Sequence, residues 1–312
     1  MSEKSPFARF DHIGVVVKDI HKTVEHYESL GLGPFIEHHH GNDSFKEKKM
    51  WGKPIPIDGF GLERRLGRVA QTRAEVLQPA WGEGPWMEFL KTKGEGIHHL
   101  AFTVDDIDWA EDWVVKKGLT VMFSTRYYEP GGAIYVDTRK VGGFVTELTQ
   151  WAPGMDVDLP ESPDKVSFSN MHHVGVMIKD MDTAIKYYES VGMGPFKPFA
   201  ELRGTIVEET QYGKPAPFEV KNMMLEVGST ELELIQPVKN SLIHGGFIEK
   251  RGEGINHVAF IIDDLDENIA KFEKKGFKVI LTRRRIGGVS AAYIDFSEIG
   301  GVIAEFIEMP KD

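Results

Sequence analysis

The chain has 312 residues, 41% of them hydrophobic and 27% charged, so it is long enough for two domains that each bury a core. Its formal net charge of -11 disfavours nucleic acid and anionic membrane surfaces, because both bind clustered Lys and Arg, and favours a small-molecule partner. The chain contains no Cys, so a metal ion would be held by His nitrogen and by carboxylate or amide oxygen. No stretch has the pattern of a signal peptide or a membrane span, and we expect a cytoplasmic protein, monomeric or homo-oligomeric.

The sequence is a tandem duplication. Residues 10–20 reappear as 171–181, and Gly33-Pro34-Phe35 recurs as Gly194-Pro195-Phe196 at the same offset of 161 (194 − 33). Farther along, residues 94–99 match 252–257 at an offset of 158 (252 − 94). Proline and acidic residues between the copies predict a linker over 153–168, which separates a first domain at 1–152 from a second at 169–312.

Each half is itself double, because a His-Asp-Gly spacing occurs four times. In the first module Asp follows His by seven residues (19 − 12) and Gly follows by nineteen (31 − 12). The four sets are His12, Asp19 and Gly31; His99, Asp106 and Gly118; His173, Asp180 and Gly192; and His257, Asp264 and Gly276. The His lies in an alternating apolar run typical of a strand, the Asp suits a helix N-cap, and the Gly suits the left-handed residue that ends a helix. With the strand-like runs that follow, this predicts an α+β fold of four βαβββ modules.

The histidines and the last strand of each module suggest metal ligands. Every second residue of a strand faces the same side, so each His has a small neighbour on its face, which indicates that the face opens on a cavity. The last strands place Gln78, Glu147, Gln236 and Glu305 among apolar residues. A buried carboxylate needs a partner, and a divalent cation held by His would supply one. The alternative is that Glu147 and Glu305 face solvent on edge strands while the histidines are structural; the fourfold repetition favours the metal.

The neighbouring residue decides which histidine of a pair is the candidate. Asp11, His98, His172 and Asn256 occupy the position before the repeated His, which is present in every module. We therefore choose His99 over His98. We expect His98 and His172 to be exposed or to support the site from the other face.

These residues resemble the vicinal oxygen chelate superfamily of glyoxalase I, extradiol dioxygenases and bleomycin-resistance proteins. The likeness is greatest to methylmalonyl-CoA epimerase-like proteins, through Asp11-His12-Ile13-Gly14, Leu77-Gln78-Pro79 and the stretch 142–147. The resemblance implies that two modules curl into one open barrel, giving two tandem barrels in this chain. It also implies two metal sites, one formed by His12, Gln78, His99 and Glu147 and the other by His173, Gln236, His257 and Glu305. Such ligands suit Co, Mn, Ni, Fe or Zn in the divalent state.

Two departures from the epimerase pattern concern the substrate. The chain resembles a fused pair, whereas those epimerases are single-barrel chains that dimerise. The stretch before Gln78 is longer and includes His38-His39-His40, Trp51 and Arg64-Arg65, so the substrate need not be an acyl-CoA. The three histidines could bind metal, but a solvated loop is the favoured alternative. Residues 283–285, all Arg, could receive an anionic group or form a solvated strand edge.

The expected activity is epimerisation or isomerisation of a small carbonyl substrate. A divalent ion would stabilise the enolate formed when a base removes the α-proton. We expect Glu47 and Glu208, which correspond at the 161-residue offset (208 − 47), to be the bases, with solvated carboxylates as the alternative. Three other functions stay open: an extradiol or 2-oxo-acid Fe(II) dioxygenase, in which one half should lose its ligands; a glyoxalase-like lyase; and a small-molecule-binding protein.

Overall fold

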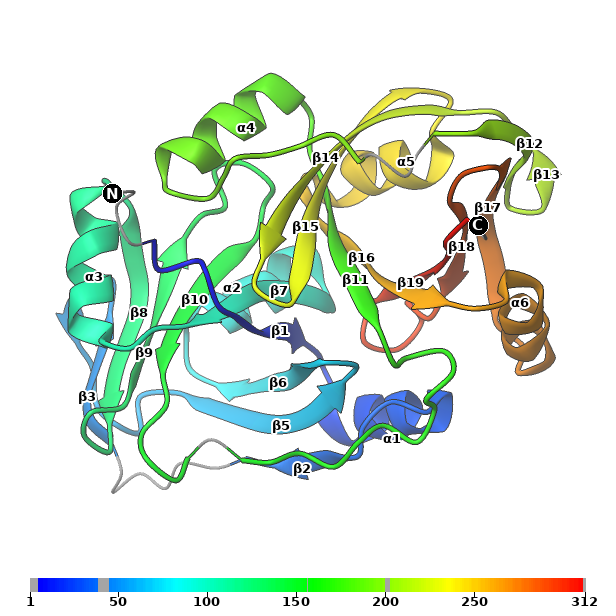
Figure 1. Ribbon diagram of the computed structural model, residues 1–312. Helices are drawn as coiled ribbons and strands as arrows, with labels where there is room; N and C mark the ends of the chain where they lie inside the picture. The colour runs from blue at the N-terminus through cyan, green and yellow to red at the C-terminus, as the bar shows by residue number, and fades with distance from the viewer. Residues whose placement is uncertain (1–4, 39–44, 156, 200–202, 311–312) are drawn as a thin grey trace.

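The chain folds around two curled β-sheets, one in each repeat (Figure 1). The protein is seen here as a computed structural model, which describes residues 5–38, 45–155, 157–199 and 203–310. The first sheet has the strand order β2-β5-β6-β1-β7-β10-β9-β8-β3-β4, and the second has the order β13-β12-β17-β18-β19-β16-β11-β15-β14. No described helix is long and apolar enough to cross a membrane.

The described residues of the first half form ten strands and three helices. The strands are β1 (Phe10–Val16), β2 (Phe35–Glu37), β3 (Phe45–Met50), β4 (Lys53–Pro54), β5 (Gly61–Val69), β6 (Thr72–Trp81), β7 (Gly96–Thr103), β8 (Thr120–Tyr127), β9 (Gly132–Asp137) and β10 (Val145–Gln150). The helices are α1 (Ile20–Leu30), α2 (Pro85–Lys93) and α3 (Ile107–Lys116).

In the second half, the part that the structure describes contains nine strands and three helices. The strands are β11 (Met171–Met177), β12 (Thr205–Gln211), β13 (Lys214–Pro215), β14 (Glu219–Val227), β15 (Thr230–Lys239), β16 (Gly254–Ile262), β17 (Lys278–Ile286), β18 (Ser290–Asp295) and β19 (Ile303–Glu308). The helices are α4 (Met181–Ser190), α5 (Leu242–Arg251) and α6 (Leu265–Lys274).

The sheet order confirms the predicted α+β class and the four βαβββ modules. In the first sheet, β1-β6-β5-β2 and β7-β10-β9-β8 run outward in the same order from a central antiparallel pair, β1 with β7. The β3–β4 hairpin is extra to the first module, and it pairs with β8 of the second module instead. In the second sheet β12 and β13 form the corresponding hairpin, and β12 pairs with β17.

The helix boundaries confirm the predicted His-Asp-Gly spacing. Asp19, Asp106, Asp180 and Asp264 are the N-caps of α1, α3, α4 and α6, and each side chain accepts a hydrogen bond from a backbone N–H of the first turn. Gly31, Gly118, Gly192 and Gly276 all have positive φ, from 78° to 104°. The repeated Asp and Gly therefore set where each helix begins and ends.

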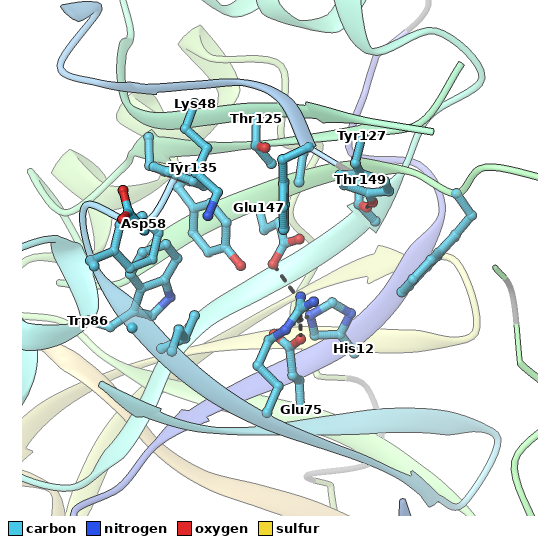
Figure 2. A pocket seen from close by; sticks show the side chains of 18 of the residues that line it. His12, Lys48, Asp58, Glu75, Trp86, Thr125, Tyr127, Tyr135, Glu147 and Thr149 are labelled. Carbon is cyan, nitrogen blue, oxygen red and sulfur yellow. Dashed lines mark hydrogen bonds and ion pairs between the residues drawn. The ribbon is translucent and has the colours of Figure 1, made fainter. Parts of the chain in front are cut away.

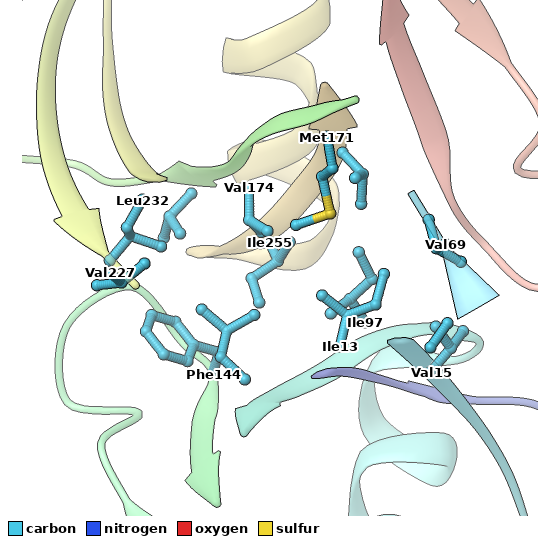
Figure 3. Close-up of a cluster of buried hydrophobic side chains, with 14 of the residues drawn as sticks. Ile13, Val15, Val69, Ile97, Phe144, Met171, Val174, Val227, Leu232 and Ile255 are labelled. Carbon is cyan, nitrogen blue, oxygen red and sulfur yellow. The ribbon is translucent and has the colours of Figure 1, made fainter. Parts of the chain in front are cut away.

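One hydrophobic core extends across both halves. Figure 3 shows Ile13 and Val15 of β1 with Met171 and Val174 of β11 among the buried side chains of this cluster. The alternation of a strand assigns the other face of β1 to His12 and Gly14, so the two faces have separate uses. The first helix of each half also contacts the other half: the Tyr27 hydroxyl of α1 donates to the Gly300 carbonyl at 3.4 Å.

Residues 153–168 form no helix or strand in their described part, but they are packed. Leu159 and Phe168 are 4% and 1% exposed, and Phe168 belongs to the shared core. Arg68 donates to Asp158 at 3.1 Å, and Lys271 forms an ion pair with Asp164. The predicted linker is therefore packed against the rest of the protein, and Phe168 inserts between side chains of the two halves.

Phe168→Ala should lower the free energy of unfolding by about 3–5 kcal/mol, because it removes a fully buried aromatic ring. Urea unfolding measures the change. Val166→Ala is the control, since Val166 is 59% exposed and should change stability by less than about 0.5 kcal/mol. Equal effects of the two substitutions would contradict the packed linker.

Candidate metal centres

The centre of each sheet places four ligand-type side chains on one face. Antiparallel pairing sets His12 of β1 opposite Ala101 of β7, and Gly14 of β1 opposite His99 of β7. On the outer sides, β6 pairs Glu75 with Gly14, and β10 pairs Glu147 with Ala101. Two adjacent rows across four strands thus each contribute one His and one Glu.

The first cluster consists of His12, Glu75, His99 and Glu147, all buried, with their ligand atoms within 4.8 Å of one another. The Oε2 of Glu147 lies 3.1 Å from His99 Nε2 and 3.4 Å from His12 Nε2. The Oε2 of Glu75 lies 3.6 Å from His12 Nε2 and 3.8 Å from His99 Nε2. None of these four atoms makes a hydrogen bond, although all are buried. Four buried, unsatisfied nitrogen and oxygen atoms that converge on one point fit a divalent ion.

The second cluster has the same composition: His173, Glu233, His257 and Glu305, again buried and within 4.8 Å. The Nε2 of His173 lies 3.0 Å from Glu233 Oε2 and 3.1 Å from Glu305 Oε2. The Nε2 of His257 lies 3.2 Å from Glu305 Oε2. The structure thus brings together all four predicted histidines and both predicted glutamates, one set in each half.

The placement of the two predicted glutamines is wrong. Gln78 lies three positions after Glu75 on β6, so it faces the other side of the sheet. Its Oε1 accepts a hydrogen bond from the backbone N–H of Ile20, at 2.7 Å, and Gln236 does the same for Met181, at 2.9 Å. These amides hold the starts of α1 and α4, and the fourth position of each cluster belongs to Glu75 and Glu233.

A signal for the missed glutamates was present in the sequence. Glu75 and Glu233 lie inside the apolar runs 74–77 and 232–235, at matching positions of the duplication (233 − 75 = 158). The rule that a carboxylate in an apolar strand needs a partner applies to them as it did to Glu147.

The small neighbours of the histidines have a steric explanation. A Cβ added to Gly14 would lie 1.9 Å from Cε1 of His99, and one added to Gly175 would lie 2.0 Å from Cε1 of His257. The second imidazole of each cluster therefore lies directly over the glycine of the neighbouring strand. Only glycine leaves that space open.

The residue before each histidine orients the imidazole. Nδ1 of His12 lies 2.9 Å from Asp11 Oδ2, and Nδ1 of His257 lies 3.2 Å from Asn256 Oδ1. In the other two modules the partner is a histidine, with Nδ1–Nδ1 distances of 2.9 Å for His98 and His99 and 2.8 Å for His172 and His173. A partner at Nδ1 leaves Nε2 to face the cluster. Of the two expectations for His98, exposure is wrong: His98 is buried and contacts His99.

The clusters hold protons when no metal is bound. Burial lowers the pKa of His12, but the carboxylates of Asp11, Glu147 and Glu75 outweigh it and raise the pKa well above 6.5. Burial also lowers the pKa of His173, but the carboxylates of Glu233 and Glu305 outweigh this effect and raise the pKa to about 10. The histidines in turn hold the pKa of Glu147 well below its ordinary value, against the effect of burial. A metal ion would have to displace these protons.

A cavity of about 230 Å³ opens from the first cluster. Figure 2 shows His12, Glu75 and Glu147 on one side of it, with Lys48, Trp86 and Tyr135 among the side chains around it. Its walls are rich in aromatic residues, and Trp86 is 2% exposed with an indole N–H that makes no hydrogen bond. A cavity with these walls suits an organic molecule with a hydrogen-bond acceptor.

The predicted bases, Glu47 and Glu208, do not line either cavity. The Glu47 carboxylate is 45% exposed and lies 2.6 Å from Lys49 Nζ. The Glu208 carboxylate is 49% exposed and lies 3.7 Å from Arg284 Nε. Strand alternation on β3 turns Glu47 outward and the next residue, Lys48, into the cavity. Both glutamates are therefore solvated carboxylates, which was the alternative interpretation.

The two other basic motifs are also placed differently from the expectation. His38 is 8% exposed and its ring packs 5.7 Å from that of Trp151, so it is not solvated; His39 and His40 lie outside the described residues. Arg283 and Arg285 lie on β17, which is paired on both sides, and line the cavity of the second cluster. They are not a solvated strand edge.

Comparison with known proteins finds one family in both halves. A family model described as Glyoxalase/Bleomycin resistance protein/Dioxygenase superfamily matches residues 11–136 and 172–293. The chain is 26% identical to the mitochondrial methylmalonyl-CoA epimerase of Bos taurus over 145 residues, 46% of this chain and 74% of that protein. It is 23% identical to the lactoylglutathione lyase of Schizosaccharomyces pombe over 297 residues, 90% of this chain and 91% of that protein. Among solved structures, a mutant 4-hydroxymandelate synthase from Streptomyces coelicolor shares the fold with a TM-score of 0.60 at 16% identity, covering 98% of this chain and 94% of that chain.

The metal content of two variants should show whether Glu75 or Gln78 is the ligand. Because Glu75 faces the cluster and Gln78 does not, Glu75→Ala should reduce bound Mn or Zn from two ions per chain to one, by elemental analysis. Gln78→Ala should keep both ions and lower the free energy of unfolding by about 1 kcal/mol through its lost bond to α1. Loss of metal from Gln78→Ala but not from Glu75→Ala would restore the glutamine ligand. A parent chain without metal would favour the binding-protein alternative.

Metal affinity at the second centre should rise with pH. The pKa of about 10 keeps His173 protonated below that pH in the metal-free protein, so binding must release its proton. We expect affinity to increase about tenfold per pH unit for each proton released, between pH 6.5 and 8.5. Calorimetry of Mn²⁺ binding to His99→Ala, which retains only this centre, measures both affinity and proton release. A pH-independent affinity would contradict the proton-filled cluster.

Proposed function

The chain belongs to the Glyoxalase/Bleomycin resistance protein/Dioxygenase superfamily, and on that basis we propose that it is a divalent-metal-dependent epimerase or isomerase that acts on small carbonyl compounds. Each half would hold one ion, through His12, Glu75, His99 and Glu147 or through His173, Glu233, His257 and Glu305. When bound, the ion supplies Lewis acidity toward a carbonyl oxygen, which makes the neighbouring C–H more acidic.

The observation that carries the proposal is the donor set of two imidazoles and two carboxylates in each half. A six-coordinate ion would keep two positions, which suit two vicinal oxygens of one substrate. Fe(II) oxygenases typically use two histidines and one carboxylate, which leaves a further position for oxygen. The fourth protein ligand, Glu75 or Glu233, therefore favours proton transfer over oxygen chemistry.

Lys48 is the proton acceptor that we propose for the first cavity. It is 7% exposed, lines the cavity, and its ammonium donates to the Ile57 carbonyl at 2.6 Å (Figure 2). Burial lowers the pKa of Lys48, and the positive charge of Arg64 adds to this effect. A lowered pKa makes the lysine ammonium lose its proton more readily, and the amine so formed can take an α-proton and return it to either face.

Exchange of α-protons in deuterated water tests the function. The Mn-loaded His257→Ala chain, which keeps the first centre, would be incubated with methylmalonyl-CoA, lactoylglutathione, phenylpyruvate and 2-oxobutyrate. Proton NMR should show exchange in at least one compound, and Lys48→Met should slow it by about 100-fold or more while retaining the metal. Lys49→Met is the matched control on the outer face, and Glu47→Gln should also leave exchange intact.

A dioxygenase is the second candidate, because the superfamily includes such enzymes. The same experiment separates the two functions when it is repeated with Fe²⁺ and an oxygen electrode. Absence of exchange in every compound, combined with iron-dependent oxygen uptake, would replace proton transfer by oxygenation. Unchanged exchange in Lys48→Met would remove Lys48 as the base and leave the function standing.

A further inference from the structure

The two cavities have the same ligand set but different walls. Each residue of the first cavity has a counterpart in the second half. The offset between the two is 161 on β12 (209 − 48) and 158 for the residues that follow β12 (283 − 125). Four wall residues of the first cavity are replaced in the second: Arg64 by Asn222, Trp86 by His244, Thr125 by Arg283 and Tyr127 by Arg285. Lys48, which lines the first cavity, corresponds to Glu209, which does not line the second. The second cavity has thus gained the guanidinium groups of Arg283 and Arg285, lost that of Arg64, and lost aromatic surface.

The charge of Arg283 is already balanced. Its Nε lies 2.5 Å from Glu209 Oε1, and its Nη2 donates to the Phe218 carbonyl at 2.8 Å. The guanidinium also stacks over the Phe218 ring, 3.7 Å from the ring centre. Arg283 therefore forms a fixed part of the wall.

Arg285 forms no ion pair with a described residue. Its Nη1 donates to the Val289 carbonyl at 3.0 Å, but its Nε is buried and makes no hydrogen bond. No described carboxylate lies within ion-pair distance of it, and Glu233 and Glu305 contact the histidines of the cluster. A guanidinium N–H that is buried without an acceptor is costly, and an anion in the cavity would satisfy the Nε of Arg285.

The size of the second cavity limits that anion. Its volume is about 40 Å³, against about 230 Å³ for the first. This is room for a few water-sized groups beside the cluster and too little for an aromatic ring or a coenzyme. Arg285, Glu233 and Glu305 all line it, so one short molecule can reach both the guanidinium and the metal position.

We propose that the second centre takes a short carbonyl compound that carries a carboxylate. Arg285 binds the carboxylate, and the carbonyl oxygen would face the ion that His173, Glu233, His257 and Glu305 would hold. The first centre, with Tyr127 at the equivalent position and a larger cavity, takes longer substrates. The two halves thus differ in substrate while sharing one ligand set. This inference rests on the metal centres of the proposed function but not on the proton transfer.

Calorimetry of the Mn-loaded His99→Ala chain with 2-oxobutyrate tests the inference. Arg285→Gln in that background should weaken binding about tenfold or more, the range for a lost charge-assisted hydrogen bond. Arg284→Gln is the matched control, because the neighbouring Arg284 pairs with Asp266 and Glu208 outside the cavity and should leave the affinity unchanged. Uncharged 2-oxobutyramide should bind the unsubstituted Arg285 chain at least tenfold more weakly, a readout that does not depend on how the variant folds.

Equal affinity of 2-oxobutyrate for Arg285→Gln and its parent, with metal retained, would overturn the inference. So would phenylpyruvate binding at this centre as tightly as 2-oxobutyrate. Arg285-dependent binding without α-proton exchange would contradict only the proposed function. Exchange of 2-oxobutyrate protons by the His99→Ala chain that is unchanged by Arg285→Gln would contradict only the inference.

Discussion

The two centres depend on one antiparallel strand pair in each half, β1 with β7 and β11 with β16. This pairing sets a histidine of one strand opposite a small residue of the other, twice in each pair. The flanking strands, which run parallel to their neighbours, add one glutamate each in the same two rows. A register shift of one residue would turn every ligand to the opposite face, so the hydrogen-bond register itself defines the site.

The opposite face of these strands fixes that register. Ile13 and Val15 of β1 and Val174 and Val176 of β11 are buried in the core that the halves share. Burial of one face strongly specifies register, because a slip would expose the apolar set. The same apolar residues that hold the halves together therefore hold the histidines in their rows. In this arrangement each half keeps its own concave face, and the cavity walls of one half can differ from those of the other.

Much of this arrangement was predictable from the sequence. The Asp caps, the terminating glycines, the four modules and six of the eight cluster residues follow from spacing and from a fourfold repeat. The prediction failed at Gln78, Gln236, Glu47 and Glu208, and for related reasons. In each case the residue type was chemically suitable but the side chain points to the wrong face. The family pattern supplied a glutamine, whereas strand alternation places Glu75 three residues earlier on the correct side.

The sequence by itself determined the number of modules, the helix ends and the identity of the histidines, because these depend on local spacing that repeats along the chain. It did not determine which residue of a short strand faces the cavity, since a slip of one residue changes the face while leaving the pattern almost intact. Nor did it show that Arg285 lines the same cavity as Glu305 without an ion pair to any described carboxylate, because that depends on how β17, β18 and β19 pack against one another. Only the tertiary structure decided the fourth ligand, the orientation of Lys48 and the different walls of the two cavities.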